Sequence, residues 1–214
     1  MFIGKYNKSI VISYLGVLFA VFGMYFIIRS SDIKATMICF MLAGVCDMLD
    51  GMVARMLKRD KDDELYGIQL DSLADTVDFV VFPIVIGLVL QFSKWYQVIG
   101  YVLLAMAAIQ RLCHFNVLVI NKKDKGPVKS YSGLPVTSTS ITYPVIYLIS
   151  TILFKINKDI NIFEALFTFV TYASAILFVL NIKVPKIKGK AYTAVGLLAV
   201  LGVILVCVLW FTNI

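Results

Sequence analysis

The chain has 214 residues, of which 60% are hydrophobic and only 15% are charged, and its formal net charge is +7. Soluble domains are about 45–50% apolar and about 25% charged, so this composition excludes an ordinary soluble protein. A basic surplus alone would fit nucleic-acid binding, but the distribution of the basic residues, described below, indicates a membrane protein instead.

Seven stretches of the chain are long and apolar enough to cross a bilayer as helices, which takes about 20 residues each. No stretch outside them is long enough to form a second domain. We therefore predict an all-α integral membrane protein, with a single domain over residues 1–214 and about seven transmembrane helices. The predicted spans are 9–28, 35–57, 66–91, 95–120, 134–154, 162–182 and 191–212.

The basic residues gather on one side of the predicted bundle. If successive spans alternate in direction, 13 Lys and Arg residues fall on the side of the N-terminus and 5 fall on the other side. The side richer in Lys and Arg usually faces the cytoplasm, so we expect a cytoplasmic N-terminus. Anionic lipid headgroups are the natural partners of these residues, and we expect no nucleic-acid partner.

Acidic residues interrupt the second and third spans, where charged groups are costly and usually functional. Asp47 and Asp50, in the stretch CDMLDGMVAR, lie three residues apart and so share one helix face. Asp71 and Asp75, in GIQLDSLAD, lie four residues apart and share a face of the next helix. A short charged loop makes the two helices antiparallel neighbours. At 1.5 Å per residue, all four carboxylates then lie about 8–15 Å inside the cytoplasmic end.

Four carboxylates at one site would repel one another or take up protons unless a cation neutralises them. Oxygen ligands suit Mg²⁺, Mn²⁺ or Ca²⁺, so we predict that these four acids hold a divalent metal. The alternatives are a polar helix–helix contact, or carboxylates that are neutralised by Arg55 and lysines. Asp78 lies one turn beyond Asp75, and we expect it to make a polar contact deeper in the bundle.

Small and basic residues accompany the acids. Gly51 and Ala54 follow Asp47 by four and seven residues, so a strip of small residues runs beside the carboxylates and would let a flat ligand come close. Tight helix packing would explain either small residue equally well. The guanidinium of Arg55 suits bidentate contact with a phosphate. Gly67 stands one turn before Asp71 and would line the same cavity.

Together these residues read D-x2-D-G-x2-A-R, then eleven residues, then G-x3-D-x3-D. The pattern resembles the signature of the CDP-alcohol phosphotransferases, integral membrane enzymes that make the headgroup linkages of phospholipids. The resemblance implies a six-helix core, to which this chain adds a further span. The gap before Gly67 is longer than in the family's usual pattern. The extra residues fall in the charged loop, so we expect a longer turn and an intact site.

The resemblance also implies roles for the signature residues. Asp47, Asp50 and Asp71 would be ligands for Mg²⁺ or Mn²⁺, with two ions expected. Asp75 would complete the metal site and act as general base on the acceptor hydroxyl. Attack on the lipid-side phosphorus would then release CMP and leave a phosphodiester lipid. The CDP-binding residues would be Asp47, Gly51, Ala54, Arg55 and Gly67.

Two further stretches, IQRLCHFNVL in the fourth span and KSYSGLPVTST before the fifth, resemble the phosphatidylserine synthase branch of the family. This implies CDP-diacylglycerol as donor and L-serine as acceptor. Arg111, at the depth of the aspartates, and the helix N-terminus at Ser132 and Gly133 would attract the serine carboxylate. His114, the only histidine, stands where the branch commonly has another residue, and it would also contact the acceptor if it faces the cavity.

Alternatives stay open at this point. The same chemistry could use another alcohol, such as glycerol phosphate or inositol phosphate. A cation channel or transporter could also use the acids, but we see none of the internal repeats that transporters often show. We expect an active site that faces the cytoplasm within a multi-pass membrane protein, and a homodimer is one option for its assembly.

Overall fold

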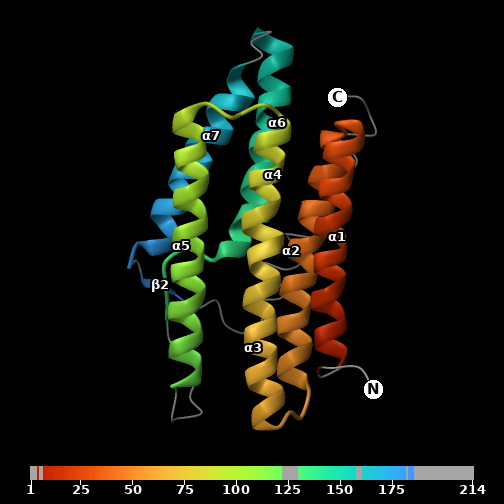
Figure 1. The fold of residues 1–214 in the computed structure, drawn as a ribbon, viewed down its shortest axis with the longest axis vertical. Helices are drawn as coiled ribbons and strands as arrows, with labels where there is room; N and C mark the ends of the chain where they lie inside the picture. The colour runs from red at the N-terminus through yellow and green to blue at the C-terminus, as the bar shows by residue number, and fades with distance from the viewer. Residues whose placement is uncertain (1–3, 5–6, 122–129, 158–160, 182, 186–214) are drawn as a thin grey trace.

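The computed structural model describes residue 4 and residues 7–121, 130–157, 161–181 and 183–185. Six helices in this part of the chain are long and apolar enough to cross a membrane, which confirms the first six predicted spans and a multi-pass helical membrane fold. The seventh predicted span, 191–212, lies outside the described residues. Figure 1 shows the helices side by side as a bundle. They are α1 (Lys8–Ser30), α2 (Ile33–Met56), the rod from Lys61 to Val89, α5 (Trp95–Ile120), α6 (Thr139–Asn157) and α7 (Asn161–Val179).

The third span is one rod made of α3 (Lys61–Thr76), a π-helical turn η1 (Val77–Val81) and α4 (Phe82–Val89). Pro83 has no backbone N–H, so the carbonyl of Phe79 loses its usual helical donor. The hydroxyl of Thr139, in the first turn of α6, donates to that carbonyl at 3.1 Å. A neighbouring helix therefore supplies the hydrogen bond that this carbonyl in the irregular turn lacks, and the contact fixes the rod against α6.

Helices α1 and α2 form a tight antiparallel hairpin (Figure 1). Ser31 ends α1 in the left-handed region, and the side chain of Asp32 caps α2 by accepting from the backbone N–H of Ala35 at 3.0 Å. Gly23 lets α1 approach the rod closely, because a Cβ at that position would lie only 2.2 Å from the ring of Phe82. The hairpin thereby packs closely against the rod that carries Asp71 and Asp75.

Aromatic side chains fill the centre of the bundle. The rings of Phe40 in α2 and Phe82 in α4 lie 4.8 Å apart, and those of Tyr143 in α6 and Phe167 in α7 lie 4.7 Å apart. All four side chains are fully buried. This core joins the hairpin to the second half of the bundle and leaves the lower end, where α2 and α3 meet, for polar groups.

Two three-residue strands, β1 (Ser130–Ser132) and β2 (Lys183–Pro185), pair in an antiparallel arrangement. Strand β1 precedes η2 (Val136–Ser138) and α6, and β2 follows α7. The sequence did not predict this pair. Its ladder ties the start of α6 to the end of α7, and the backbone N–H of Leu134 adds a hydrogen bond to the carbonyl of Leu177 at 3.1 Å.

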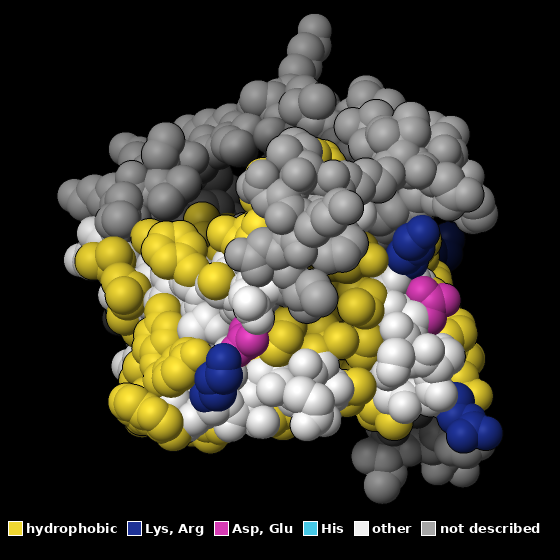
Figure 2. Space-filling view, turned by 90° about the horizontal axis from the view of Figure 1, so that it is seen from above, with side chains coloured by type: hydrophobic (Ala, Val, Ile, Leu, Met, Phe, Trp, Pro, Cys, Tyr) yellow, Lys and Arg dark blue, Asp and Glu magenta, His cyan; other side chains and the backbone are white. Residues whose placement is uncertain are grey.

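The opposite end of the bundle, where α1 ends and α5 begins, is shown in Figure 2, with mostly hydrophobic side chains on its described surface. At this end Lys94 forms a salt bridge with Glu164 at 2.8 Å, and the Gln97 side chain donates to Glu164 at 2.9 Å. The hydrogen bond to Glu164 raises the pKa of Lys94. These contacts connect the starts of α5 and α7.

Candidate active site

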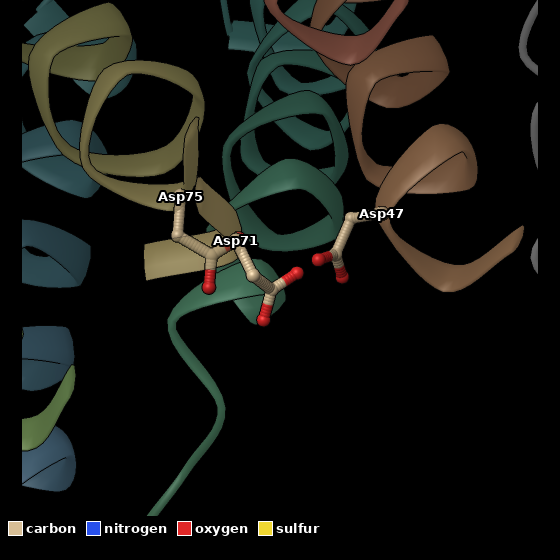
Figure 3. Close-up of side chains that lie close together, drawn as sticks. All are labelled: Asp47, Asp71 and Asp75. Carbon is tan, nitrogen blue, oxygen red and sulfur yellow. The ribbon is translucent and has the colours of Figure 1, made fainter. Parts of the chain in front are cut away.

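Three carboxylates from two helices converge at the lower end of the bundle. Asp47 from α2 and Asp71 and Asp75 from α3 each offer an oxygen, and these oxygens all lie within 4.8 Å of one another. Figure 3 shows the three side chains pointing toward a common space between the helices. Asp75 is buried, Asp47 is partly buried and Asp71 is exposed, so the cluster has one side open to ligands.

This arrangement fits a divalent cation. Oxygen ligands bind Mg²⁺ at about 2.0–2.1 Å and Ca²⁺ at about 2.3–2.6 Å, so two oxygens on one ion lie at most about 4.2 Å apart around Mg²⁺ and about 5.2 Å apart around Ca²⁺. The oxygens of the cluster lie within 4.8 Å of one another, which is inside the Ca²⁺ bound and within about 1 Å of the Mg²⁺ bound, so small side-chain adjustments would bring them onto either ion. Three carboxylates this close repel one another, and a shared cation would offset that repulsion.

Asp50, the fourth acid of the pattern, takes a different position. It is buried in α2 and its carboxylate accepts a hydrogen bond from the hydroxyl of Ser13 in α1. The hydroxyl of Ser9 also donates to the backbone carbonyl of Asp50 at 3.3 Å. Asp50 is not part of the three-carboxylate cluster, and its role as a metal ligand stays a prediction.

A cavity of about 200 Å³ opens beside the cluster. Six of the eight signature residues line it, because the helix faces that carry the acids also carry the small residues. Ser9, Ile10 and Ser13 of α1 form another wall. The signature residues in the lining are Asp50, Gly51, Ala54, Arg55, Gly67 and Asp71.

The surroundings of Gly51 distinguish between the two explanations for the small residues, which are helix packing and ligand binding. A Cβ at Gly51 would meet no atom within 4 Å, whereas one at Gly44, two turns earlier in α2, would collide with the Ser140 side chain at 2.1 Å. Helix packing therefore requires a glycine at position 44 but not at position 51. The space over Gly51 is open to the cavity, which favours a ligand there.

The structure also shows lining residues that the sequence did not single out. Ser9 and Ser13 are buried on the face of α1 that meets α2, and Arg59 lies in the link between α2 and α3. No pattern in the sequence pairs α1 with the aspartates. The basic character of the link is visible in the sequence, but the sequence does not show which of its side chains lines the cavity.

The predicted acceptor residues lie apart from this cavity. The Nη1 of Arg111 is 3.5 Å from the backbone carbonyl of Phe178, and it would lie 2.6 Å from a Cβ on Gly133, which has a φ of 76°. His114 is exposed on α5. Neither Arg111 nor His114 lines the cavity, and the side chain of Ser132 lies outside the described part. Their contact with an acceptor stays a prediction.

We expected Asp78 to make a polar contact deeper in the bundle, and one of its two carboxylate oxygens lacks such a contact among the described residues. It is buried in the π-helical turn, and its Oδ1 has no hydrogen-bond partner in the described part of the chain. Its Oδ2 would lie 3.0 Å from a Cβ on Gly16, so the glycine in α1 leaves room for this carboxyl.

Comparison with known proteins agrees with this geometry. The sequence profile of a family described as CDP-alcohol phosphatidyltransferase matches residues 7–213, nearly the entire chain. The chain belongs to this family. The match includes every residue of the acidic cluster and of the adjoining cavity.

Curated relatives of this family member carry related names. A CDP-diacylglycerol–serine O-phosphatidyltransferase of Saccharomyces cerevisiae is 39% identical over 104 residues, which are 47% of this chain and 37% of the yeast protein. One of Mycobacterium bovis is 34% identical over 117 residues, 51% of this chain and 38% of that protein. An archaetidylserine synthase of Methanothermobacter thermautotrophicus is 28% identical over 179 residues, 82% of this chain and 69% of the archaeal protein. The chain thus spans under two fifths of the yeast and mycobacterial proteins.

Proposed function

We propose that this protein transfers the phosphatidyl group of CDP-diacylglycerol to the hydroxyl of L-serine, releasing CMP and forming phosphatidylserine. The observation that supports this proposal most strongly is that Asp47, Asp71 and Asp75 converge beside a cavity whose space over Gly51 is open. The names of the relatives support serine as the acceptor, because two are serine O-phosphatidyltransferases and the third makes archaetidylserine.

The acidic cluster would hold Mg²⁺ or Mn²⁺. Asp47, Asp71 and Asp75 supply the converging oxygens, and Asp50, fixed by Ser13, would contribute to a second ion. When bound, the metal would neutralise the diphosphate and the charge that develops on the departing CMP.

The cavity would hold the CDP headgroup. Gly51 and Ala54 leave room for it, and the guanidinium of Arg55 is suited to donate to a phosphate oxygen. Ser13 holds the Asp50 carboxylate in one orientation through its hydroxyl. The remaining wall is the α3 face that carries Gly67 and Asp71.

Asp75 would act as the general base. Its carboxylate is buried beside the two other acids, where water has little access to it. It would accept the proton of the serine hydroxyl as that oxygen forms a bond to the lipid-side phosphorus. The bond from that phosphorus to the bridging oxygen breaks, and the electron pair leaves with CMP.

We further propose that this end of the bundle faces the cytoplasm, because the side with more Lys and Arg residues includes the α2–α3 link. In a variant without native cysteines, Lys61→Cys should be shielded from an impermeant thiol reagent in intact cells, and Lys94→Cys should be labelled. The reverse pattern would contradict this orientation.

An acceptor screen tests the proposed function. Purified protein with CDP-diacylglycerol and Mg²⁺ or Mn²⁺ should release CMP when L-serine is added. Ethanolamine lacks the carboxylate and should support little release, and glycerol phosphate and inositol phosphate should support little as well. Release with one of these alcohols but not with serine would retain the phosphotransfer and reject the serine assignment. If no alcohol supports CMP release, the proposed phosphotransferase activity is rejected.

A further inference from the structure

Arg59 is a basic residue of the cavity that lies outside the family signature. It sits in the four-residue link between α2 and α3, between Leu57 and the α3 N-cap residue Asp60. It lines the same cavity as Arg55 and is partly buried, whereas its neighbour Lys58 is exposed. Of the two basic residues in the link, only Arg59 thus turns toward the cavity.

The guanidinium of Arg59 lies over Gly67 in α3. A Cβ at Gly67 would stand 3.1 Å from Nη1 of Arg59, and no other atom outside the local helix backbone would lie within 4 Å of it. A methyl group there would press on the guanidinium and on nothing else. Gly67 therefore provides the space in which Arg59 rests against the helix.

The cavity has an acidic end and a basic end. Asp71 belongs both to the metal cluster and to the cavity wall, and Gly67 lies one helical turn from it toward the link, about 6 Å along the axis. A CDP headgroup with its diphosphate at the cluster and its lipid tail in the membrane would extend its nucleoside toward the polar link. Arg59 then meets the base end of the headgroup, beyond the phosphates.

We propose that Arg59, seated on Gly67, binds the cytosine of the donor and selects it against uracil; this rests on the proposed function of the site. A guanidinium has only donors, and the pairing edge of cytosine places two acceptors, O2 and N3, side by side. Uracil has an N–H at N3, which opposes the same donors. A site built to donate two hydrogen bonds discriminates strongly against a base that cannot accept both.

The experiment measures equilibrium binding of CDP and UDP to the purified full chain in detergent with Mg²⁺, without any turnover. The native protein should bind CDP roughly tenfold to a hundredfold more tightly than UDP, the effect of one hydrogen bond to a charged group. Arg59→Ala should weaken CDP binding at least roughly tenfold and leave UDP binding nearly unchanged. Arg59→Lys should behave like Arg59→Ala, because an ammonium cannot donate the paired hydrogen bonds.

A control variant and a double-mutant comparison complete the test. Lys58→Ala removes the adjacent, exposed charge and should leave both affinities unchanged. Gly67→Ala should weaken CDP binding in the native background but add little to Arg59→Ala, because both changes remove one contact. Thermal unfolding of each variant verifies that it is folded.

The outcomes separate this inference from the proposed function. Equal losses for CDP and UDP in Arg59→Ala, or losses equal to those in Lys58→Ala, would overturn the assignment of Arg59 to the base. Additive effects of Gly67→Ala and Arg59→Ala would overturn it as well. If the native protein binds CDP selectively through Arg59 but releases no CMP with any alcohol, the inference stands and the proposed function fails.

Discussion

The hydroxyl of Ser13 in α1 donates a hydrogen bond to the carboxylate of Asp50 in α2, 37 residues further along the chain. Both side chains are buried and both line the cavity. The bond joins a helix without any signature residue to the helix that carries five of them. The first helix is therefore part of the site and not only a membrane anchor.

Removal of the Ser13 hydroxyl should weaken the site without abolishing it. A hydrogen bond to a charged group contributes about 1.5–3 kcal/mol, so we expect Ser13→Ala to lower kcat/KM for CDP-diacylglycerol by roughly tenfold to a hundredfold. Ser30→Ala, which removes an exposed hydroxyl bonded to Phe26 in the same helix, is the control and should have no effect. Native kinetics in Ser13→Ala would show that this bond does not orient Asp50.

Gly51→Ala should separate activity from stability. The added methyl group meets no protein atom within 4 Å, and alanine is favoured over glycine in a helix by roughly 0.5–1 kcal/mol, so thermal stability should be unchanged or slightly raised. The same methyl group projects toward the cavity, so the KM for CDP-diacylglycerol should rise. Gly23→Ala should instead destabilise the protein through its clash with Phe82. Unchanged kinetics in Gly51→Ala would contradict a ligand in that space.

The metal site predicts a dependence on divalent ions. Asp47→Asn and Asp71→Asn should each abolish turnover and weaken binding of Mn²⁺, measured by electron paramagnetic resonance, because each removes one of three converging ligands. Asp62→Asn, an exposed change in the first turn of α3, is the matched control. Full activity in excess chelator would exclude the shared metal site.

The general base predicts a different pattern at Asp75. Asp75→Asn should reduce kcat by about 10²–10⁴, the usual contribution of such a group. Binding of CDP-diacylglycerol should persist, because the cavity residues are unchanged. If affinity for the donor falls in step with kcat, Asp75 serves chiefly as a metal ligand and the base lies elsewhere.

Local sequence patterns predicted the features of the fold that depend on helix periodicity. The first six spans follow from apolar length, and the meeting of Asp47 with Asp71 and Asp75 follows from helical spacing and a short connecting loop. These inferences need only the helical rise and the antiparallel arrangement of neighbours. The carboxylate cluster of the site could be predicted from the sequence for that reason.

Contacts between distant segments were not predictable in the same way. The hydroxyl of Ser13 reaches Asp50, and the hydroxyl of Thr139 donates to the backbone carbonyl of Phe79, only because of how the helices pack. Arg111 was placed by depth alone, and depth does not give the direction of a side chain around its helix. The β1–β2 pair consists of two three-residue segments that carry too little pattern to be recognised.

The most direct measurement of the central claim follows the lipid-side phosphate. CDP-diacylglycerol labelled with ³²P at the phosphate attached to diacylglycerol is incubated with purified protein, L-serine and Mg²⁺ or Mn²⁺, and the products are separated. The proposed reaction predicts that all transferred label appears in phosphatidylserine, with an equal amount of unlabelled CMP. Label in a water-soluble nucleotide, or CMP release without phosphatidylserine, would contradict it.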